Sequence, residues 1–423
     1  MKSKKLIPPL RFSLFSENWV ENTIDDVLER IVNPVEVSGE KEYRQIGIRS
    51  HGKGIFHKEK VLGKELGNKR VFWLEEDLFI VNIVFAWEMA VGKTTLSEKG
   101  LIASHRFPMY RPKSQILFLD FILYFFLRKK GKHILELASP GGAGRNKTLG
   151  QKEFSKSKII IPNDILEQQK IASFLSAVDK KITQLQQKKG LLENYKKGVM
   201  QLIFSQELRF TREDGTTYPD WEEKKFKDIY SFYSTNSFSR DKLNYESGIV
   251  RNVHYGDIHT KFSTLFDIND ELVPYINKEV DLSKIKKDSY LKLGDLLIAD
   301  TSEDYNDIGK TIEVVNLNDE KVISGLHTFH ARPNKHKMAL GFSGYLLQSW
   351  MIRKQVMKIA QGTKVLGIST GRLAEIKFFI PSYEEQSQIA HFLSAIDRKI
   401  ALVQTQIAET QTFKKGLLQQ LFV

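Results

Sequence analysis

The sequence predicts an α+β protein built as an internal repeat, in which two globular lobes of mixed α/β structure each precede one long helix. Three observations support this fold class. One segment occurs twice at a constant spacing, that segment has the heptad pattern of a packed helix, and the regions between the copies combine short apolar runs with glycine-containing loops. At roughly 100–200 residues per domain, a chain of 423 residues is long enough for about two to four domains.

The repeat is clearest where residues 171–204 align with residues 389–422 at a constant offset of 218. The two copies are identical at 15 of these 34 positions, and both contain the runs IA-x-FLSA-x-D-x-KI and KKG. A weaker echo precedes each copy, because LRF is followed by Trp19 in the first half and by Trp221 in the second. We therefore predict four parts: a lobe at 1–158, a helical segment at 159–208, a second lobe at 209–376 and a second helical segment at 377–423.

Each helical segment is predicted to begin with a short apolar strand that ends at a proline, Pro162 or Pro381, and to continue as a helix of about 40 residues. The apolar positions then alternate in steps of four and three, as they do in a helix that packs along another helix. The predicted seam positions are Ile171, Leu175, Val178, Ile182, Leu185, Lys189, Leu192, Lys196, Val199 and Ile203 in the first copy, and Ile389, Leu393, Ile396, Ile400, Val403, Ile407, Thr410, Lys414, Leu417 and Leu421 in the second.

Two lysines occupy equivalent seam positions, Lys196 and Lys414. Two interpretations remain open. A lysine can reach solvent from such a position at low cost, or the seam opens there to bind another protein. Two such helices in one chain most simply pack on each other and hold the two lobes a fixed distance apart.

The charge of the chain favours a polyanionic partner, with nucleic acid as the first candidate. The 64 Lys and Arg residues exceed the 51 Asp and Glu residues by 13. The excess is uneven: residues 1–158 hold 28 basic and 18 acidic residues, whereas residues 209–376 hold 24 of each. The first lobe thus has a strongly basic character, and the second would need local placement of charge to bind nucleic acid.

Composition also excludes several classes of protein. The absence of cysteine excludes disulfides, thiolate metal sites and cysteine nucleophiles. The first nine residues are basic and then proline-rich, without the apolar core of a signal peptide. The most apolar stretch, residues 116–127, contains Asp120 and is too short to span a bilayer. We interpret it as part of a buried helix over 114–131, expect a similar helix over 339–358, and expect a cytoplasmic protein.

Loops in both lobes carry the side chains that we predict to contact DNA. Three pairs of loops recur in the same order: 49–54 with 251–257, 87–95 with 300–304, and 139–148 with 361–364. Arg, Lys, Asn and His can hydrogen-bond to base edges, and glycine lets backbone amides approach phosphates; the alternative for each loop is a plain turn. The predicted contacts are Arg49, Ser50, His51, Lys53, Lys93, Thr94, Arg106, Arg145, Asn146 and Lys147 in the first lobe, and Arg251, Asn252, His254, Tyr255, Thr301, Ser302, His327, Thr328, Thr363 and Lys364 in the second.

The sequence supports no catalytic or metal-binding arrangement. Gly92-Lys93-Thr94 resembles the end of a phosphate-binding P-loop, but the glycine required five positions earlier is replaced by Trp87. His327 and His330 lack further ligands nearby in the sequence, so base-reading or buried histidines are favoured over a metal site. We therefore predict no catalytic residue and no metal ligand in this chain.

The element IP-x(n)-EQ-x-x-IA-x-FL-x-x-D-x-x-I, which is present twice, resembles the conserved regions of type I restriction–modification specificity subunits. It is formed by Ile161-Pro162, Glu167-Gln168, Ile171-Ala172, Phe174-Leu175, Asp179 and Ile182, and again by Ile380-Pro381, Glu385-Gln386, Ile389-Ala390, Phe392-Leu393, Asp397 and Ile400. The LRF–Trp openings, GGAGRNKTLGQKEF and AQGTKVLGISTGRLAEIKFFIP are also similar to that family. The resemblance covers essentially the whole chain.

The resemblance implies that each lobe is a target-recognition domain that reads one half of a split double-stranded DNA sequence. It also implies that the two helices form an antiparallel coiled-coil pair that sets the gap between half-sites at about one DNA turn. Such subunits lack catalysis and bind no cofactor themselves. They join two modification subunits, which bind S-adenosylmethionine and methylate adenine, and restriction subunits, where present, add ATP- and Mg-dependent translocation and cleavage. The implied contacts to partner subunits are Glu167, Gln168, Ile171, Asp179, Glu385, Gln386, Ile389 and Asp397.

Two other functions remain as alternatives. A methyltransferase or nuclease in its own right would need a cofactor or metal constellation, and the sequence shows none. A purely structural coiled-coil adaptor would explain the helices, but not two lobes of about 160 residues with matching glycine-bearing loops. The reading as a non-catalytic DNA-recognition subunit accounts for both.

Overall fold

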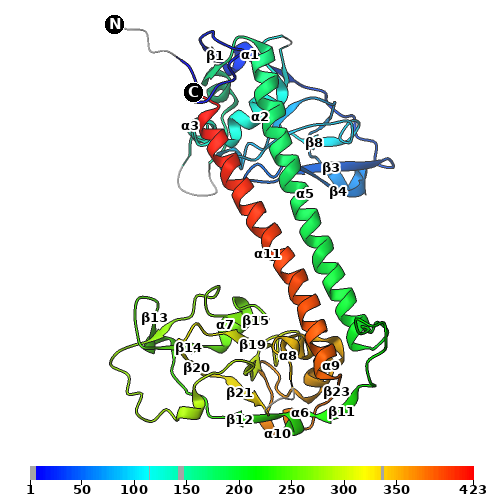
Figure 1. Ribbon diagram of the computed structural model, residues 1–423. Helices are drawn as coiled ribbons and strands as arrows, with labels where there is room; N and C mark the ends of the chain where they lie inside the picture. The colour runs from blue at the N-terminus through cyan, green and yellow to red at the C-terminus, as the bar shows by residue number, and fades with distance from the viewer. Residues whose placement is uncertain (1–5, 114, 142–146, 335–337) are drawn as a thin grey trace. The chain divides into compact units, whose positions relative to one another are not determined.

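The computed structural model describes residues 6–113, 115–141, 147–334 and 338–423. These residues form two compact units. Unit 1 comprises Met1–Gln186 and Thr405–Val423, and unit 2 comprises Gln187–Gln404. The division differs from the four predicted parts, because each long helix contributes one portion to unit 1 and the other portion to unit 2 (Figure 1).

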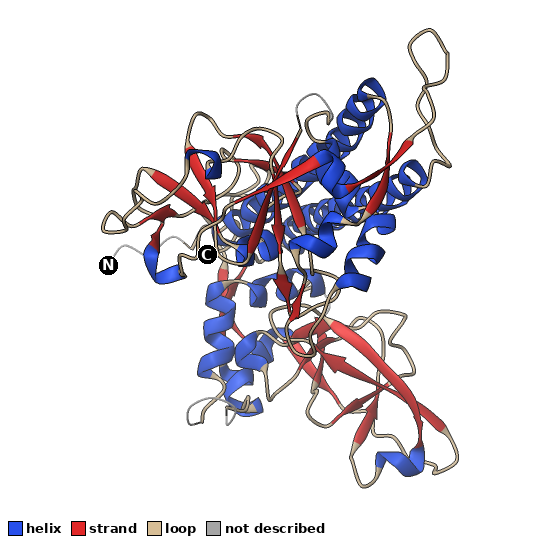
Figure 2. Ribbon diagram, turned by 90° about the horizontal axis from the view of Figure 1, so that it is seen from below, coloured by secondary structure: helices blue, strands red, loops and turns tan. Residues whose placement is uncertain are grey.

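Unit 1 contains three small sheets, ordered β1-β10, β2-β9-β6-β7 and β4-β3-β8-β5. All pairings are antiparallel except that of β3 with β8. Figure 2 shows the strands in red as several short sheets, not one large one. The elements are β1 Val20–Thr23, α1 Ile24–Val27, β2 Leu28–Ile31, β3 Glu42–Ile48, β4 Ile55–Leu62, β5 Val71–Trp73, β6 Phe79–Val81, β7 Val91–Lys93, β8 Ile102–Ser104, β9 Met109–Pro112, α2 Leu119–Leu127, α3 Lys129–Leu137, α4 Gln151–Lys156 and β10 Lys158–Ile161.

The late apolar helix predicted over 114–131 is two helices in the structure. α2 ends at Leu127, Arg128 is extended with ψ of 166°, and α3 begins at Lys129. The two helices pack so tightly that a Cβ on Gly131 would lie 2.1 Å from the carbonyl oxygen of Phe125. This close packing of two consecutive helices requires glycine at position 131. Sequence periodicity could not reveal the break, because it does not report how one helix packs against the next.

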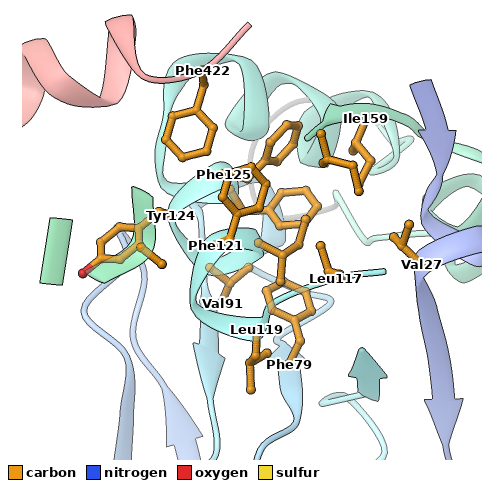
Figure 3. Close-up of a cluster of buried hydrophobic side chains, with 14 of the residues drawn as sticks. Val27, Phe79, Val91, Leu117, Leu119, Phe121, Tyr124, Phe125, Ile159 and Phe422 are labelled. Carbon is orange, nitrogen blue, oxygen red and sulfur yellow. The ribbon is translucent and has the colours of Figure 1, made fainter. Parts of the chain in front are cut away.

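Aromatic side chains form the core of unit 1 between α2 and the sheet β2-β9-β6-β7 (Figure 3). The ring of Phe422, from the end of the chain, lies 5.1 Å from that of Phe121 and 6.3 Å from that of Trp19. Phe79 stacks on Phe126 at 5.3 Å. The core of unit 1 therefore combines the first lobe with the last residues of the second helical segment.

Unit 2 has the same plan with additional strands. Its sheets are ordered β11-β23, β12-β21-β17-β19-β15, β13-β16-β14-β20 and β18-β22. β14 pairs with β20 in parallel, as β3 does with β8 in unit 1. The elements are β11 Glu222–Lys225, α6 Phe226–Ile229, β12 Tyr230–Tyr233, β13 Leu243–Asn244, β14 Val250–Val253, α7 Tyr255–Thr260, β15 Leu265–Asp267, β16 Tyr275–Ile276, β17 Leu296–Ala299, β18 Thr301–Ser302, β19 Thr311–Asn316, β20 Lys321–Ser324, β21 Thr328–Pro333, α8 Phe342–Gln348, α9 Trp350–Ile359, β22 Leu366–Gly367, α10 Thr370–Ala374 and β23 Lys377–Ile380.

The helix predicted over 339–358 is also broken, at Ser349 between α8 and α9. The core of unit 2 matches that of unit 1. The ring of Phe204 lies 6.4 Å from that of Trp221 and 5.9 Å from that of Phe342. Phe204 and Phe422 are 218 residues apart, so the offset of the sequence repeat extends to the aromatic residue that enters each core.

The two long helices are α5, Ile165–Phe204, and α11, Tyr383–Gln420. Their predicted seam is confirmed at every apolar position, each of which is buried or half-buried, including Leu175 and Leu393 with no exposed surface. The polar positions Lys189, Lys196, Thr410 and Lys414 are half-buried. The heptad pattern therefore predicted the buried face of both helices correctly.

The seam lysines are held by ion pairs. In unit 1, Lys414 donates to Asp179 at 2.5 Å, and the Tyr124 hydroxyl donates to the same carboxylate at 2.8 Å. In unit 2, Lys196 and the Tyr345 hydroxyl both donate to Asp397 at 2.7 Å. Burial, followed by the nearby carboxylate, raises the pKa of both tyrosines. The structure thus gives each seam lysine a carboxylate partner within its own unit.

These pairs also give the direction of the helices. Asp179 on α5 pairs with Lys414 on α11, and Lys196, which is later on α5, pairs with Asp397, which is earlier on α11. Pairing positions that run in opposite directions are those of antiparallel helices. Because Asp179 corresponds to Asp397 and Lys196 to Lys414 in the repeat, the two ion pairs are also equivalent to each other.

A buried carboxylate ties α8 to the sheet of unit 2. Glu313 on β19 is 1% exposed and accepts hydrogen bonds from the backbone N–H groups of Gly341 and Gly344, both at 2.7 Å. Burial raises the pKa of Glu313 to about 7, although the backbone donors oppose this shift. Near neutral pH the side chain therefore titrates inside the folded unit.

We predict that Glu313 makes the stability of unit 2 fall as pH rises. A carboxyl group whose folded pKa exceeds its unfolded pKa stabilises the fold in acid, and the contribution is lost as pH rises through the folded value of about 7. The loss between pH 4.5 and pH 8 is about 3 kcal/mol at 1.36 kcal/mol per unit. Urea unfolding across this range should show a smaller decline in Glu313→Gln than in the wild type. Parallel pH profiles would contradict the assignment.

Candidate nucleic-acid interface

In unit 1, the loop at residues 49–54 is held by backbone contacts and leaves its basic side chains exposed. The N–H groups of His51 and Gly52 donate to the carbonyls of Glu88 and Met89 at 2.7 and 3.0 Å. The Ser50 hydroxyl donates to the Glu88 carboxylate at 2.8 Å. The predicted contacts Arg49, His51 and Lys53 are exposed, so this loop presents three basic side chains from a hydrogen-bonded backbone.

Two of the predicted contacts in unit 1 serve the fold instead. Thr94 is fully buried, and its hydroxyl oxygen accepts the N–H of Leu78 at 2.9 Å. Lys93 is half-buried and donates to Asp120 at 2.9 Å. The prediction is therefore wrong for Thr94, which has no surface to offer, and the charge of Lys93 is already paired within the unit.

The remaining predicted contacts of unit 1 lie on or near its surface. Arg106 is exposed in the turn between β8 and β9. Lys147 is half-buried, with its ammonium group 5.6 Å from the centre of the Trp87 ring. Arg145 and Asn146 lie outside the described residues.

Beside Arg106 lies a polar cavity of about 310 Å³, which we call cavity A. Its polar lining side chains are basic or amide groups with one serine, and no carboxylate lines it. They are Gln45, Lys58, Lys69, Asn82, Ser104, His105 and Arg106. Among the described residues no carboxylate forms an ion pair with Lys58, Lys69 or Arg106. Cavity A therefore offers unpaired hydrogen-bond donors to an anionic or electron-rich ligand.

Several predicted contacts of unit 2 are buried. Asn252 is fully buried and accepts a hydrogen bond from Asn236 at 2.7 Å. Ser302 caps the backbone of Asp304 at 3.0 Å, and the Thr328 hydroxyl donates to the carbonyl of Gly325. These three side chains lie inside the unit, so the prediction that they contact DNA is wrong for each. Polar residue type alone could not separate them from exposed loop residues.

Arg251 and His254 are also engaged within unit 2. Arg251 makes a two-point ion pair with Glu320 and lies over the Tyr275 ring at 4.2 Å. His254 is buried and accepts the N–H of Gly256 at 3.2 Å. Burial, followed by Arg240, lowers the pKa of His254 to about 4, which keeps the ring neutral at pH 7.

An aromatic and histidine group remains accessible in unit 2. The Tyr255 ring lies 4.6 Å from the His254 ring and 5.3 Å from that of His327. His327 is exposed, has a φ of 55°, and places Nδ1 3.3 Å from the Asp300 carboxylate. The carbonyl of Thr301 bonds to the ring of His259 at 2.9 Å. Thr363 and Lys364 are exposed in a separate loop.

His327 lines a cavity of about 670 Å³, which we call cavity B. Its other polar lining groups include Asn236, Lys284, Lys286 and Asp300. Unlike cavity A, cavity B contains carboxylates, in agreement with the balanced charge of the second lobe.

Cavities A and B occupy equivalent places. In unit 1, β9 pairs with β2 and β6, and in unit 2, β21 pairs with β12 and β17. The turns before β9 and β21 carry Arg106 and His327, whose carbonyls accept the N–H groups of Ile83 and Asp300 at 3.0 and 3.1 Å. Arg106 in unit 1 and His327 in unit 2 therefore hold the same position in the fold, although the two residues differ in type.

Sequence reasoning missed several residues of these cavities. Gln45, Lys69 and His105 line cavity A, whereas Asn236, Lys284 and Lys286 line cavity B. Gln45 lies within strand β3, and the others lie outside the three loop pairs. A search for amide and basic residues beside the paired loops would have found some of them, but only the strand pairing brings them together.

The Glu-Gln pairs of the repeat are internal anchors. Glu167 is 1% exposed. Its carboxylate accepts two hydrogen bonds of 2.7 Å from the Arg11 guanidinium and one of 3.2 Å from the Trp19 indole N–H. Glu385 in unit 2 likewise accepts two contacts from Arg209, at 3.1 and 2.8 Å, and one from Trp221 at 3.1 Å. The LRF–Trp echo of the sequence therefore supplies the partners of these two carboxylates.

The adjacent glutamines bind backbone groups. Gln168 accepts the N–H of Phe118 and donates to the carbonyls of Ile116 and Pro162, all within 2.9 Å. Gln386 accepts the N–H of Ala339 at 2.8 Å and donates to Pro381 at 3.0 Å.

Contacts of these repeated residues with partner subunits stay a prediction. The structure adds that the side chains of Glu167, Gln168, Ile171, Glu385, Gln386 and Ile389 are buried within this chain, and that Asp179 and Asp397 hold the seam lysines. Of the implied contacts, Asp179 and Asp397 are therefore the two whose side chains keep exposed surface, 38% and 37%, for a partner subunit.

Among the described residues, no group of three or more His, Asp or Glu side chains is arranged to hold a metal ion. No described helix is both long and apolar enough to span a membrane. His330 is fully buried and bonds to Asp295 at 2.7 Å, so it is a buried histidine, as one of the two favoured interpretations had it.

We predict that Glu167→Gln destabilises unit 1 by about 3–5 kcal/mol, because it leaves the Arg11 guanidinium without its buried carboxylate. Glu42→Gln is the matched control, since its pair with Lys60 is exposed on both sides and should cost less than about 1 kcal/mol. Urea unfolding at pH 7 gives both values. Equal effects in the two variants would show that Glu167 is not an anchor.

The two halves of the sequence repeat each match one known protein family. The sequence profile described as "Type I restriction modification DNA specificity domain" matches residues 17–194 and again residues 218–411. A similar curated protein is the type I restriction enzyme MjaVIII specificity subunit of Methanocaldococcus jannaschii. It is 26% identical over 369 residues, which cover 84% of this chain and 80% of the relative.

Solved structures share the fold at low sequence identity. The HsdS subunit from Thermoanaerobacter tengcongensis aligns with a TM-score of 0.53 at 14% identity, covering 100% of this chain and 98% of the other. The S subunit of a type I restriction–modification system from M. genitalium aligns with a TM-score of 0.57 at 14% identity, covering 99% of both chains.

Proposed function

The chain belongs to the type I restriction–modification DNA specificity family, with two copies of the family domain, and on this basis we propose that cavities A and B each read one half of a split DNA target. The chain is the DNA specificity subunit of such a system. Its lobes supply base recognition, and its long helices join it to the other subunits of the complex.

The observation that carries the assignment of the reading sites is the equivalence of Arg106 and His327. Both lie in the turn that precedes an inner strand of their sheet, beside a polar cavity. The surrounding backbone is held in the same way, yet the side chains differ. Arginine commonly makes a two-point contact with guanine, whereas histidine offers one ring nitrogen at a time. Two lobes of one fold would therefore read two different half-sites.

Catalysis belongs to the partner subunits in this proposal. The chain itself would bind no cofactor. Two modification subunits would bind S-adenosylmethionine and methylate adenine, and restriction subunits, where present, would use ATP and Mg for translocation and cleavage. Activity of the purified chain alone on DNA, as methylation or as cutting, would overturn this part of the proposal.

The modification subunits would dock on exposed aromatic residues of the long helices. Tyr195 on α5 and Phe413 on α11 are both 54% exposed and are 218 residues apart, so they hold equivalent positions. An exposed aromatic side chain beside a packed seam is a typical anchor for a protein partner. This equivalent pair, with one member in each copy of the repeat, agrees with two modification subunits per chain.

We predict that Arg106→Ala relaxes base preference at one position of one half-site, by about 1–3 kcal/mol, because a two-point contact to a base edge is lost. His327→Ala should relax one position of the other half-site. The measurement is sequencing of methylated adenine in cells that express each variant with its modification subunits.

Lys132→Ala provides the control for Arg106→Ala, because it removes a basic residue that pairs with Glu136 away from cavity A. It should leave the methylated motif unchanged. If Arg106→Ala and His327→Ala altered the same half-site, or neither half-site, cavities A and B would not be the reading sites.

For partner docking, we expect Tyr195→Asp and Phe413→Asp each to reduce the number of modification subunits that co-purify with the chain from two to one. Asn194→Asp, next to Tyr195 and also exposed, introduces the same charge without removing the aromatic group and should bind two. Mass measurement of the purified complex distinguishes these states. Full assembly of both aromatic variants would rule out this docking surface.

A further inference from the structure

A second cavity of unit 1 lies where the end of α11 meets the start of α3. This cavity, which we call cavity C, has a volume of about 340 Å³. Arg128 and Lys129 line it from the start of α3, and Lys414 and Lys415 line it from α11. No carboxylate is among its lining residues. Lys414 is paired with Asp179, but Lys129 and Lys415 have no ion pair among the described residues.

The start of α3 is electrostatically unfavourable as it stands. The N-terminus of a helix carries partial positive charge and free N–H groups, and it is stabilised by acidic residues. α3 has no acidic residue in its first turn and no side-chain cap, and it begins with Lys129 and Lys130. The nine-residue helix α3 therefore carries two lysines at its N-terminus, where a helix favours negative charge.

Arg128 adds a buried and incompletely paired cation to cavity C. It is 7% exposed, its guanidinium lies 4.3 Å from the Phe125 ring, and its Nη1 donates to the backbone oxygen of Val423 at 2.8 Å. Its Nε has no hydrogen-bond partner. Burial lowers the pKa of Arg128 to about 10. The guanidinium also lies 4.8 Å from the Phe422 ring, so among the described residues its partners are two aromatic rings and one oxygen of Val423, and only Nε is left without one.

One wall of cavity C is the loop at residues 49–54, which the sequence already suggested as a DNA contact. His51 and Gly52 line the cavity. Gly52 has a φ of 66° and approaches α2 so closely that a Cβ would lie 2.2 Å from Leu127 Cδ2. The glycine therefore lets the loop lie against the end of α2, with Arg49 and Lys53 exposed beside the cavity.

We propose that cavity C binds a phosphate group of the DNA backbone and so fixes the position of unit 1 on the duplex. The phosphate would contact Lys129, Lys415 and the free N–H groups at the start of α3. This inference rests on the function proposed above, but concerns a contact that is independent of base sequence.

Unit 2 provides an internal comparison. Its equivalent cavity, cavity D, is lined by residues 193, 196, 197, 200 and 201, which correspond to 411, 414, 415, 418 and 419 of cavity C at the offset of 218. In cavity D, however, two of the lining residues are the carboxylates Glu193 and Asp397, and Trp350 begins the helix in place of a lysine. Cavity D thus sets Lys196, Lys197 and Arg353 beside two carboxylates, whereas the cations that line cavity C have no carboxylate among them.

The test measures how the affinity of the full chain for a fluorescent DNA duplex depends on KCl concentration. Loss of one phosphate contact reduces the slope of log K against log salt by about 0.9. We expect this reduction for Lys129→Gln and for Lys415→Gln. Lys197→Gln, at the position of cavity D that corresponds to Lys415, removes the same charge and should leave the slope unchanged. Circular dichroism checks that all variants are folded.

Three outcomes would overturn the proposal. An equal reduction in Lys415→Gln and Lys197→Gln would show a general effect of charge. An unchanged slope in all variants would exclude a DNA phosphate in cavity C. If inorganic phosphate also raised the Tm of the wild type but not of Lys129→Gln, with unchanged slopes, the site would bind free phosphate instead of DNA.

Failure of the proposed function would look different. A backbone contact weakens binding to all duplexes by about the same factor, whereas a base contact changes the preference for one sequence. Suppose that Arg106→Ala loses base selectivity while Lys129→Gln keeps the salt slope of the wild type. The specificity role would then stand, and the phosphate site in cavity C would be discarded. The reverse result would discard cavity A as the reading site and retain cavity C.

Discussion

Each unit buries its core only with the help of the long helix that follows the other lobe. Phe422, just beyond the end of α11, packs between Trp19 and Phe121 in unit 1. Phe204, at the end of α5, packs between Trp221 and Phe342 in unit 2. Full burial of one such side chain contributes about 1.5–3 kcal/mol. The antiparallel direction of the helices follows from this exchange, because each helix starts in one unit and ends in the core of the other.

The residues that repeat are those with the same structural role in both units. Glu167 and Glu385 each bind an arginine and a tryptophan from the LRF–Trp segment. The seam lysines each bind an aspartate that also accepts a tyrosine. These polar groups are buried or half-buried and would be costly if unpaired, so substitution at one member requires a change in its partner. Residues at the mouths of the cavities face no such constraint and differ between units.

The division between what the sequence could predict and what it could not follows from the range of the interactions. The structure confirms the strand before each proline and the buried face of α5 and α11. Both can be predicted because they depend on the local pattern of apolar residues. The breaks at Arg128 and Ser349 depend on packing between consecutive helices, which periodicity does not encode. The site predictions were weakest for the same reason. Asn252 and Thr328 have the residue type of a DNA contact, but strand pairing places them inside unit 2.

The charge of the two units also has a structural explanation. In unit 1, cavities A and C are lined by basic side chains and by no carboxylate. In unit 2, by contrast, Arg251, Arg240 and Arg332 are all paired with carboxylates. Recognition by unit 2 would therefore depend more on shape and individual hydrogen bonds, and recognition by unit 1 more on charge.

The central claim is that two lobes, completed by shared helices, recognise one DNA molecule at two separate places. Hydroxyl-radical footprinting of the assembled complex on a duplex that contains its methylated motif tests this most directly. The account predicts two protected tracts separated by an accessible gap, with the Arg106→Ala variant losing protection in only one tract. A single continuous tract, or loss of both tracts together in that variant, would contradict it.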